Sequence, residues 1–283
     1  MDYPKVKIYQ GGYDGFGHQF EGTLRLLSLA INEKAIYMYD YKKTFKFDHT
    51  PRDSDILMNY IQEGLKYLKS LDTSYMSLPI DLSYNILNGD NRSFDEIAIR
   101  DTVNCIYLYD GVGCGWGLPP NFEHTDVIGK SLPILRCAFV THNSFLPPPT
   151  YDNKYLNVCC HIRLGDAVGT RPLDTQNICN VIRFYQKQNK KYRVIIHSDE
   201  DVNYLQFDNT IIYNKSTDVI NVFSDFIHAD ILVMNMSSLS IAAHLLGEPN
   251  QIVICPDEHG TTNFKHRILE KCITCSAILS IAV

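Results

Sequence analysis

The second half of the chain alternates short apolar segments with amphipathic ones, and this alternation limits the folds that the chain can adopt. The expected strands are residues 156–162, 192–197, 210–213, 230–234 and 251–255. The expected helices are residues 174–189, 219–228, 239–246 and 263–272. Short strands that alternate with helices form a parallel, doubly wound sheet, so the pattern predicts an α/β fold.

The first half begins with a similar pattern. A strand over residues 5–10 runs into a loop with four glycines among residues 11–17, and apolar residues at helical spacing follow over residues 19–31. A second strand is expected over residues 35–39, which completes one βαβ unit. The glycine spacing is not G-x-G-x-x-G, so this loop is not the dinucleotide-binding fingerprint.

The rest of the first half is less regular. An amphipathic helix is predicted over residues 53–71 and a strand over residues 103–109, with irregular structure over residues 72–100. Three consecutive prolines at residues 147–149 cannot belong to a helix interior or a central strand. We therefore place a domain boundary there and predict two Rossmann-like domains, residues 1–146 and 147–283.

Composition narrows the classes of partner. The net charge of −6 gives no general electrostatic support to nucleic-acid binding. The N-terminus has no signal-peptide core, and no run reaches the roughly 18 apolar residues of a membrane helix, so we expect a cytoplasmic protein without a transmembrane segment. Nine cysteines cannot all pair, and the single CxxC at residues 272–275 lacks a second ligand pair, so we expect free thiols and no metal site.

Polar residues follow several strands of the predicted second sheet, where the carboxyl ends of parallel strands share one edge. Arg163 follows the strand over residues 156–162, and its guanidinium matches phosphate oxygens. Ser237 and Ser238 precede a helix, where hydroxyl and free N–H groups can receive phosphate oxygens. The expected ligand is the diphosphate of a nucleotide-sugar, although an N-cap serine is also common without a ligand.

Four short motifs together resemble one enzyme family. Residues 161–166, HIRLGD, are similar to the H-x-R-R-x-D motif of the inverting alpha-1,2, alpha-1,6 and protein O-fucosyltransferases. Residues 15–19, GFGHQ, resemble the N-terminal G-x-G-N-Q loop of that group. Residues 197–201 resemble its S-D-D segment, and residues 229–238 resemble its apolar strand that ends in a serine pair. The four motifs occur in the family's order.

The resemblance implies a GT-B architecture, with two Rossmann-like domains facing a central cleft. It implies a metal-independent, inverting transfer of a sugar, first of all fucose from GDP-fucose, to the hydroxyl of an oligosaccharide or glycoprotein. The C-terminal domain would bind the nucleotide-sugar as co-substrate, with no other cofactor, and the N-terminal domain would serve the acceptor. The donor-binding residues that it implies are Gly15, Gly17, His161, Arg163, Asp166, Ser198, Asp199, Asp225, Ser237 and Ser238.

Arg163 would also be catalytic, because a cation there would stabilise the leaving nucleotide. The family has an acidic residue on a helix that contacts the base of the nucleotide. Its position falls nearest Val222 here, between Asp218 and Asp225, and we assign this role to Asp225. An inverting transfer also needs a group that takes the acceptor proton, unless its transition state is highly dissociative. Glu21, His18 and Asp14, on or beside the Gly-rich loop, are the candidates, and Glu21 and His18 are preferred.

Three residues depart from the family pattern and leave alternatives open. Leu164 stands where the motif has its second arginine, Gly15 where the protein O-fucosyltransferases have an arginine, and His18 where the loop has an asparagine. Another donor such as UDP-xylose, used by a xylosyltransferase, is therefore an alternative. A catalytically silent nucleotide- or sugar-binding protein is a second one. A Rossmann oxidoreductase is less favoured, because the dinucleotide fingerprint is absent.

Overall fold

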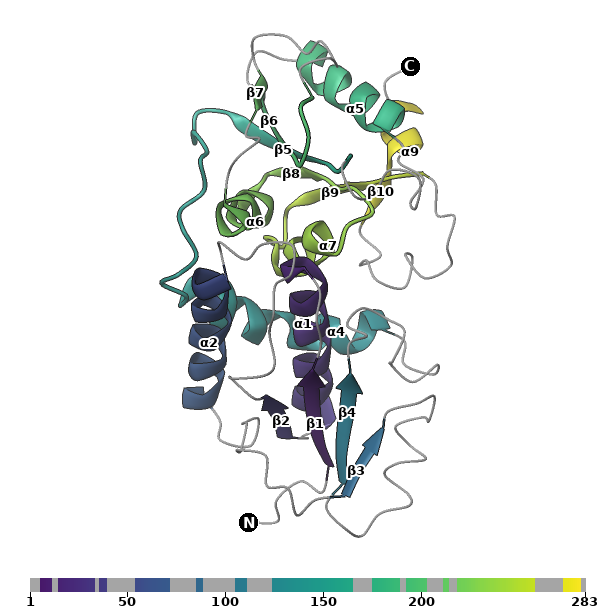
Figure 1. The fold of residues 1–283 in the computed structure, drawn as a ribbon. Helices are drawn as coiled ribbons and strands as arrows, with labels where there is room; N and C mark the ends of the chain where they lie inside the picture. Colours follow the sequence, from purple (N-terminus) through teal and green to yellow (C-terminus); the bar gives the residue numbers. More distant parts are fainter. Residues whose placement is uncertain are drawn as a thin grey trace. The chain divides into compact units, whose positions relative to one another are not determined.

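The structure is a computed structural model that describes most of the chain. The described residues are 6–11, 15–33, 36–39, 54–71, 85–88, 105–110, 124–164, 175–188, 192–202, 211–213, 218–257 and 272–280. The chain divides into two units, Met1–Leu146 and Pro147–Val283. Each unit contains its own parallel sheet with helices, which confirms the α/β prediction (Figure 1).

The N-terminal unit is built on a four-stranded parallel sheet of order β2-β1-β4-β3. Its elements are β1 (Val6–Gly11), α1 (Phe16–Glu33), β2 (Ile36–Tyr39), α2 (Ser54–Leu71), β3 (Asn85–Asn88), β4 (Cys105–Asp110), α4 (His124–Arg136) and the π-helical turn η3 (Cys137–Thr141). The strand β3 falls in the range expected to be irregular, because four residues with asparagine at both ends carry too weak a strand pattern to recognise.

An aromatic cluster forms the core between α1, α2 and η3. Phe20 is fully buried, and its ring lies 5.3 Å from that of Tyr60 and 5.1 Å from that of Phe139, measured between centroids. Phe16 stacks on Phe20 at 5.3 Å, one helical turn earlier. Gly64 leaves the space on α2 into which the Phe139 ring fits, since a Cβ at this position would lie 2.2 Å from the ring.

We therefore expect Gly64→Ala to destabilise the protein, although alanine is the better helix former. The added methyl group would collide with Phe139, and overpacking of this kind costs about 1–3 kcal/mol. Gly129→Ala on α4 is the matched control, because a Cβ there meets nothing within 4 Å. Chemical denaturation should show a lower free energy of unfolding for the first variant only. Equal stability of the two variants would contradict the packing argument.

The C-terminal unit is built on a six-stranded parallel sheet of order β10-β9-β8-β5-β6-β7. Its elements are β5 (Leu156–Ile162), α5 (Thr175–Gln188), β6 (Tyr192–Ser198), β7 (Ile211–Tyr213), α6 (Val219–His228), β8 (Ile231–Val233), α7 (Ser238–Leu246), β9 (Ile252–Cys255), β10 (Ile273–Thr274) and α9 (Cys275–Ser280). The expected helix over residues 263–272 lies almost wholly outside the described residues.

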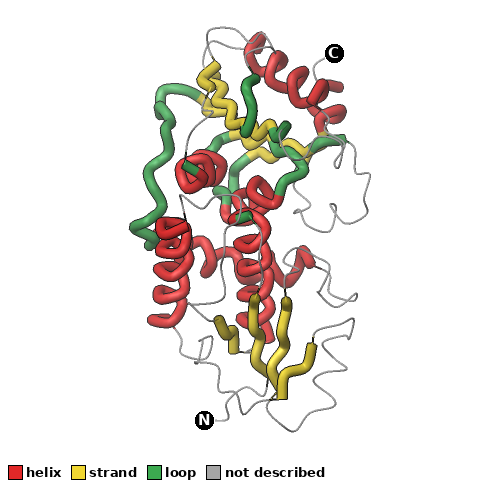
Figure 2. The backbone as a smooth tube through the Cα atoms, in the orientation of Figure 1, coloured by secondary structure: helices red, strands yellow, loops and turns green. Residues whose placement is uncertain are grey.

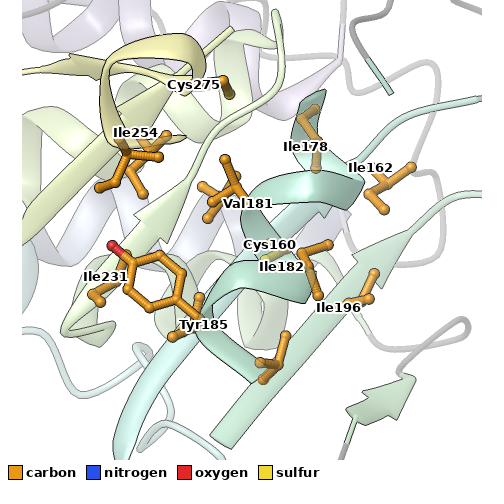
Figure 3. Packing of buried hydrophobic residues seen from close by; sticks show 14 of the residues in the cluster. Cys160, Ile162, Ile178, Val181, Ile182, Tyr185, Ile196, Ile231, Ile254 and Cys275 are labelled. Atoms are coloured by element: carbon orange, nitrogen blue, oxygen red, sulfur yellow. The ribbon is translucent and has the colours of Figure 1, made fainter. Parts of the chain in front are cut away.

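Helices cover both faces of this sheet, with α5 and α9 on one side and α6 and α7 on the other (Figures 1 and 2). The α5 side packs Ile178, Val181 and Ile182 against alternate strand residues such as Cys160 and Ile196 (Figure 3). Successive side chains of a strand point to opposite faces of the sheet. His161 and His197, which directly follow Cys160 and Ile196, therefore lie on the face that α6 and α7 cover.

Candidate functional site

The order of the strands locates the edge at which this kind of sheet binds ligands. From β5 the chain proceeds outward through β6 to β7, and it returns to the other side of β5 with β8 before it proceeds outward to β9 and β10. The direction of winding therefore changes between β5 and β8. In open α/β sheets, ligands bind beyond the carboxyl ends of the strands at such a switch point.

Arg163 and Ser237 lie at this switch point, one after each of the two strands. The Arg163 Nη1 atom donates to the Ser237 Oγ atom at 3.4 Å. Arg163 is half-buried, and Ser237 is 1% exposed. The structure thus brings together two residues that are 74 positions apart in the sequence and that were both predicted to bind phosphate.

Ser237 is also the N-cap of α7. Its Oγ atom accepts a hydrogen bond from the Leu239 N–H group at 3.4 Å, and Ser238 is the first residue of the helix. The first N–H groups of a helix point out of its N-terminus, where the helix dipole favours an anion. The Arg163 guanidinium and the N–H groups at the N-terminus of α7 can therefore both donate hydrogen bonds to one phosphate group.

His161 lies on the face of the sheet that α6 and α7 cover, and its ring contacts Ser240 of α7. Ser240 is not among the site residues predicted from the sequence. The distance from His161 Nδ1 to Ser240 Oγ is 3.2 Å, and Ser240 also donates to the main-chain oxygens of Asn235 and Ser237 at 3.0 Å. Burial lowers the pKa of His161 to about 3, with Arg163 and His197 as further causes. The imidazole is therefore neutral at pH 7.

We expect this buried neutral histidine to make stability depend on pH. The unfolded chain protonates His161 near pH 6.5, whereas the folded chain does so only near pH 3, so stability is complete above pH 6.5 and falls as the pH decreases toward 3. The slope from this group is at most about 1.4 kcal/mol per pH unit. His161→Asn should reduce the difference in unfolding free energy between pH 7.5 and pH 5, whereas His142→Asn at an exposed position should not. An unchanged difference in the first variant would contradict the burial argument.

The structure places Asp225 in the interior of the C-terminal unit. The carboxylate is fully buried, and both of its oxygens accept hydrogen bonds from protein groups. Oδ1 accepts from the Thr150 N–H group at 2.7 Å, and Oδ2 accepts from the Thr150 hydroxyl at 2.8 Å and from His197 Nε2 at 2.9 Å. The Asp225 side chain has no exposed surface in this structure, and its contact with the base of a nucleotide stays a prediction. Asp218, the alternative acid, is exposed at the N-cap of α6.

The loop after β6 supports the loop that carries Arg163, because Asp199 Oδ1 accepts a hydrogen bond from the Leu164 N–H group at 2.7 Å. Ser198, the last residue of β6, accepts one with its Oγ atom from the Glu200 N–H group at 3.2 Å. Leu164 packs against the hydrophobic core on the α5 face. Leu164 stands where the motif has its second arginine. Its apolar side chain therefore contacts the face of the sheet that α5 covers. Asp166 lies outside the described residues.

The candidate residues of the N-terminal unit surround the start of α1. Gly15 immediately precedes the helix, and Gly17 and His18 are half-buried in its first turn. Glu21 is fully buried and forms an ion pair with Arg25 one turn later, at 2.9 Å from Oε1 to Nη2. A buried carboxylate held by an arginine has a structural role of its own, so His18 is the better placed of the two preferred bases. Asp14 lies outside the residues that the structure describes.

The cysteines of the C-terminal unit are free thiols among the described residues. Burial raises the pKa of the Cys160 thiol well above its usual value, so this group stays protonated. In the CxxC segment, Cys275 is buried and Cys272 Sγ lies 3.4 Å from His244 Nε2. Within the part of the chain that the structure describes, no three His, Cys, Asp or Glu residues are grouped so that they could bind a metal ion. None of the described helices is long and apolar enough to cross a membrane.

Comparison with known proteins gives similarity at the level of structure only. No family model matches the chain, and no curated protein matches it. It is similar to the NodZ alpha-1,6-fucosyltransferase co-crystallised with GDP, with 12% identity and a TM-score of 0.49 over 90% of this chain and 96% of that one. It is also similar to POFUT1 in complex with GDP-fucose, with 11% identity and a TM-score of 0.46 over 90% of this chain and 98% of that one.

A third similar structure is the ADP-heptose LPS heptosyltransferase II of E. coli, with 10% identity and a TM-score of 0.44 over 96% of this chain and 90% of that one. At such identities and TM-scores, similarity establishes neither a family nor an activity. The function is therefore inferred from the residues at the switch point.

Proposed function

We propose that the protein is a glycosyltransferase that binds the diphosphate of a nucleotide-sugar in its C-terminal unit. The observation that carries this proposal is the contact between Arg163 and Ser237 at the N-terminus of α7, at the switch point of the six-stranded sheet. Breaking the bond between a sugar and a nucleoside diphosphate leaves negative charge on the phosphate oxygens. Donors fixed in advance at that point stabilise the charge as it develops.

The proposed reaction is a direct, inverting displacement in which Arg163 and the end of α7 neutralise the leaving diphosphate without a metal ion. His161 is neutral, so its imidazole can form a hydrogen bond with a ligand without adding charge to the site. The N-terminal unit supplies the acceptor side in this proposal, with His18 as the group that takes the proton from the acceptor hydroxyl. An oligosaccharide or a glycoprotein is the proposed acceptor.

The first donor to test is GDP-fucose, and the second is UDP-xylose. The motifs favour the former, whereas Leu164 leaves the site with one arginine fewer than the fucosyltransferase pattern has. A catalytically silent binding protein is the competing function, since the contacts that hold a diphosphate do not by themselves require turnover.

A thermal-shift series with GDP, UDP, GDP-fucose and UDP-xylose tests the proposal. A ligand at 100 times its Kd stabilises the folded state by about 2.7 kcal/mol, so the preferred nucleotide should raise the unfolding temperature by several degrees. Nucleotide release from the preferred sugar donor should then be measured with and without a panel of glycans. Binding without release would favour the silent binding protein. No shift with any of the four compounds would overturn the proposed function.

A further inference from the structure

The segment that leads into the C-terminal unit is fastened to α6 at several points. This connecting segment comprises residues 147–155. Thr150 donates to the Asp225 carboxylate with both its N–H group and its hydroxyl, and the Tyr151 hydroxyl donates to the main-chain oxygen of Asp225. Ser224 donates to the main-chain oxygen of Pro147 at 2.5 Å. Asp225 thus accepts three of these four hydrogen bonds.

The same carboxylate reaches the sheet through His197. The Nε2 atom of His197 must donate to Asp225 Oδ2, because a carboxylate can only accept, and the distance is 2.9 Å. His197 is 2% exposed, and its other ring nitrogen, Nδ1, makes no hydrogen bond to the described residues. Asp225 is therefore the polar contact that fixes the orientation of this ring.

From His197 a continuous series of contacts leads to Arg163. His197 and His161 are paired in register on neighbouring strands, and both rings contact Phe226, at 5.5 Å and 5.0 Å between centroids. His161 contacts Ser240, which donates to the main-chain oxygen of Ser237. Arg163 donates to the hydroxyl of that same Ser237.

We propose that Asp225 is a positioning residue that couples the connecting segment to the Arg163–Ser237 site through Thr150 and His197. The inference rests on the proposed nucleotide-binding function and adds a regulatory element to it. If a nucleotide stabilises the arrangement of Arg163 and Ser237, it also stabilises the contacts of the connecting segment with α6. Linkage then requires the reverse effect, so the nucleotide must bind more weakly, by the same factor, to the form in which the connecting segment is released from α6.

The contacts are tested first without ligand, by hydrogen exchange of the peptide that contains residues 150–156. Thr150→Val removes the hydroxyl but keeps the N–H group and the shape of the side chain, and Asp225→Asn removes one acceptor and the charge. Either change should accelerate exchange of this peptide by about tenfold, the equivalent of one hydrogen bond to a charged group. Exchange of α5, on the other face of the sheet in the same unit, reports the general stability of that unit, and Glu63→Gln on α2 is the charge-removal control. Acceleration in α5 as well would show general destabilisation and overturn the proposal.

The coupling is tested by adding GDP, and in parallel pyrophosphate, which carries the phosphate groups without the base. In the unchanged protein GDP should slow exchange of the connecting segment at least threefold. Thr150→Val should weaken GDP binding by up to the same factor, in proportion to the fraction of molecules in which the segment is released. If GDP binds but neither effect occurs, the coupling is wrong while the proposed function stands. If GDP, UDP and pyrophosphate all fail to bind, the proposed function and the coupling both fail. The exchange data without ligand then still decide whether Asp225 holds the segment.

Discussion

Replacing Arg163 with alanine is expected to weaken binding of a nucleoside diphosphate by about 100-fold and to leave the fold unchanged. Two charge-assisted hydrogen bonds from one guanidinium to phosphate are together worth about 3 kcal/mol, and each 1.4 kcal/mol is a factor of ten in Kd. Arg163 is half-buried and lies at the end of a strand, so its removal opens no cavity in the core. Isothermal titration with GDP and UDP measures the effect directly.

Two further variants separate charge from geometry in this prediction. Arg163→Lys keeps the positive charge but loses the planar fork, so binding should be intermediate between that of the alanine variant and that of the unchanged protein. Arg183→Ala removes an exposed arginine from α5, on the other face of the sheet, and should not alter binding. Equal affinities of the Arg163 and Arg183 alanine variants would show that the phosphate group is bound elsewhere.

The elements around this site could be predicted closely because each has a strong local pattern. The apolar run that forms β5 was expected over residues 156–162 and has these bounds, and α6 was expected over residues 219–228 and has these bounds as well. Both are buried elements, in which hydrophobic periodicity and the side-chain contacts agree. The pairing of Arg163 with Ser237 followed from a rule of topology, since parallel strands end at one edge.

The supporting residues of the site could not be predicted, because their roles depend on contacts between distant parts of the chain. Thr150 follows a run of prolines and carries no motif, yet it provides two of the donors to Asp225, 75 positions away. Asp225 itself was assigned to a nucleotide because local sequence shows its position on a helix and not its burial. Ser240 lies two residues beyond the recognised serine pair, and only the packing of α7 beside β5 shows that it contacts His161.

A large loss of stability in the C-terminal unit is expected from Phe226→Ala. Phe226 is fully buried and contacts both His161 and His197 with its ring. Removal of a buried phenylalanine side chain costs about 3–5 kcal/mol, which is a large part of the stability of an ordinary domain. Phe145→Ala, at a position that is 36% exposed, is the matched control and should cost much less. Chemical denaturation followed by circular dichroism measures both.

Phe226→Leu retains most of the apolar volume and gives a more specific result. The pKa of His161 is held near 3 chiefly by burial, and part of that burial comes from the Phe226 ring. A smaller side chain admits water to the imidazole, which favours its charged form, so the pKa of His161 should rise toward 6.5. Nuclear magnetic resonance of the histidine side chains can follow this titration residue by residue. A pKa that stays near 3 in the leucine variant would show that the other neighbours of His161, Arg163 among them, keep the ring neutral without Phe226.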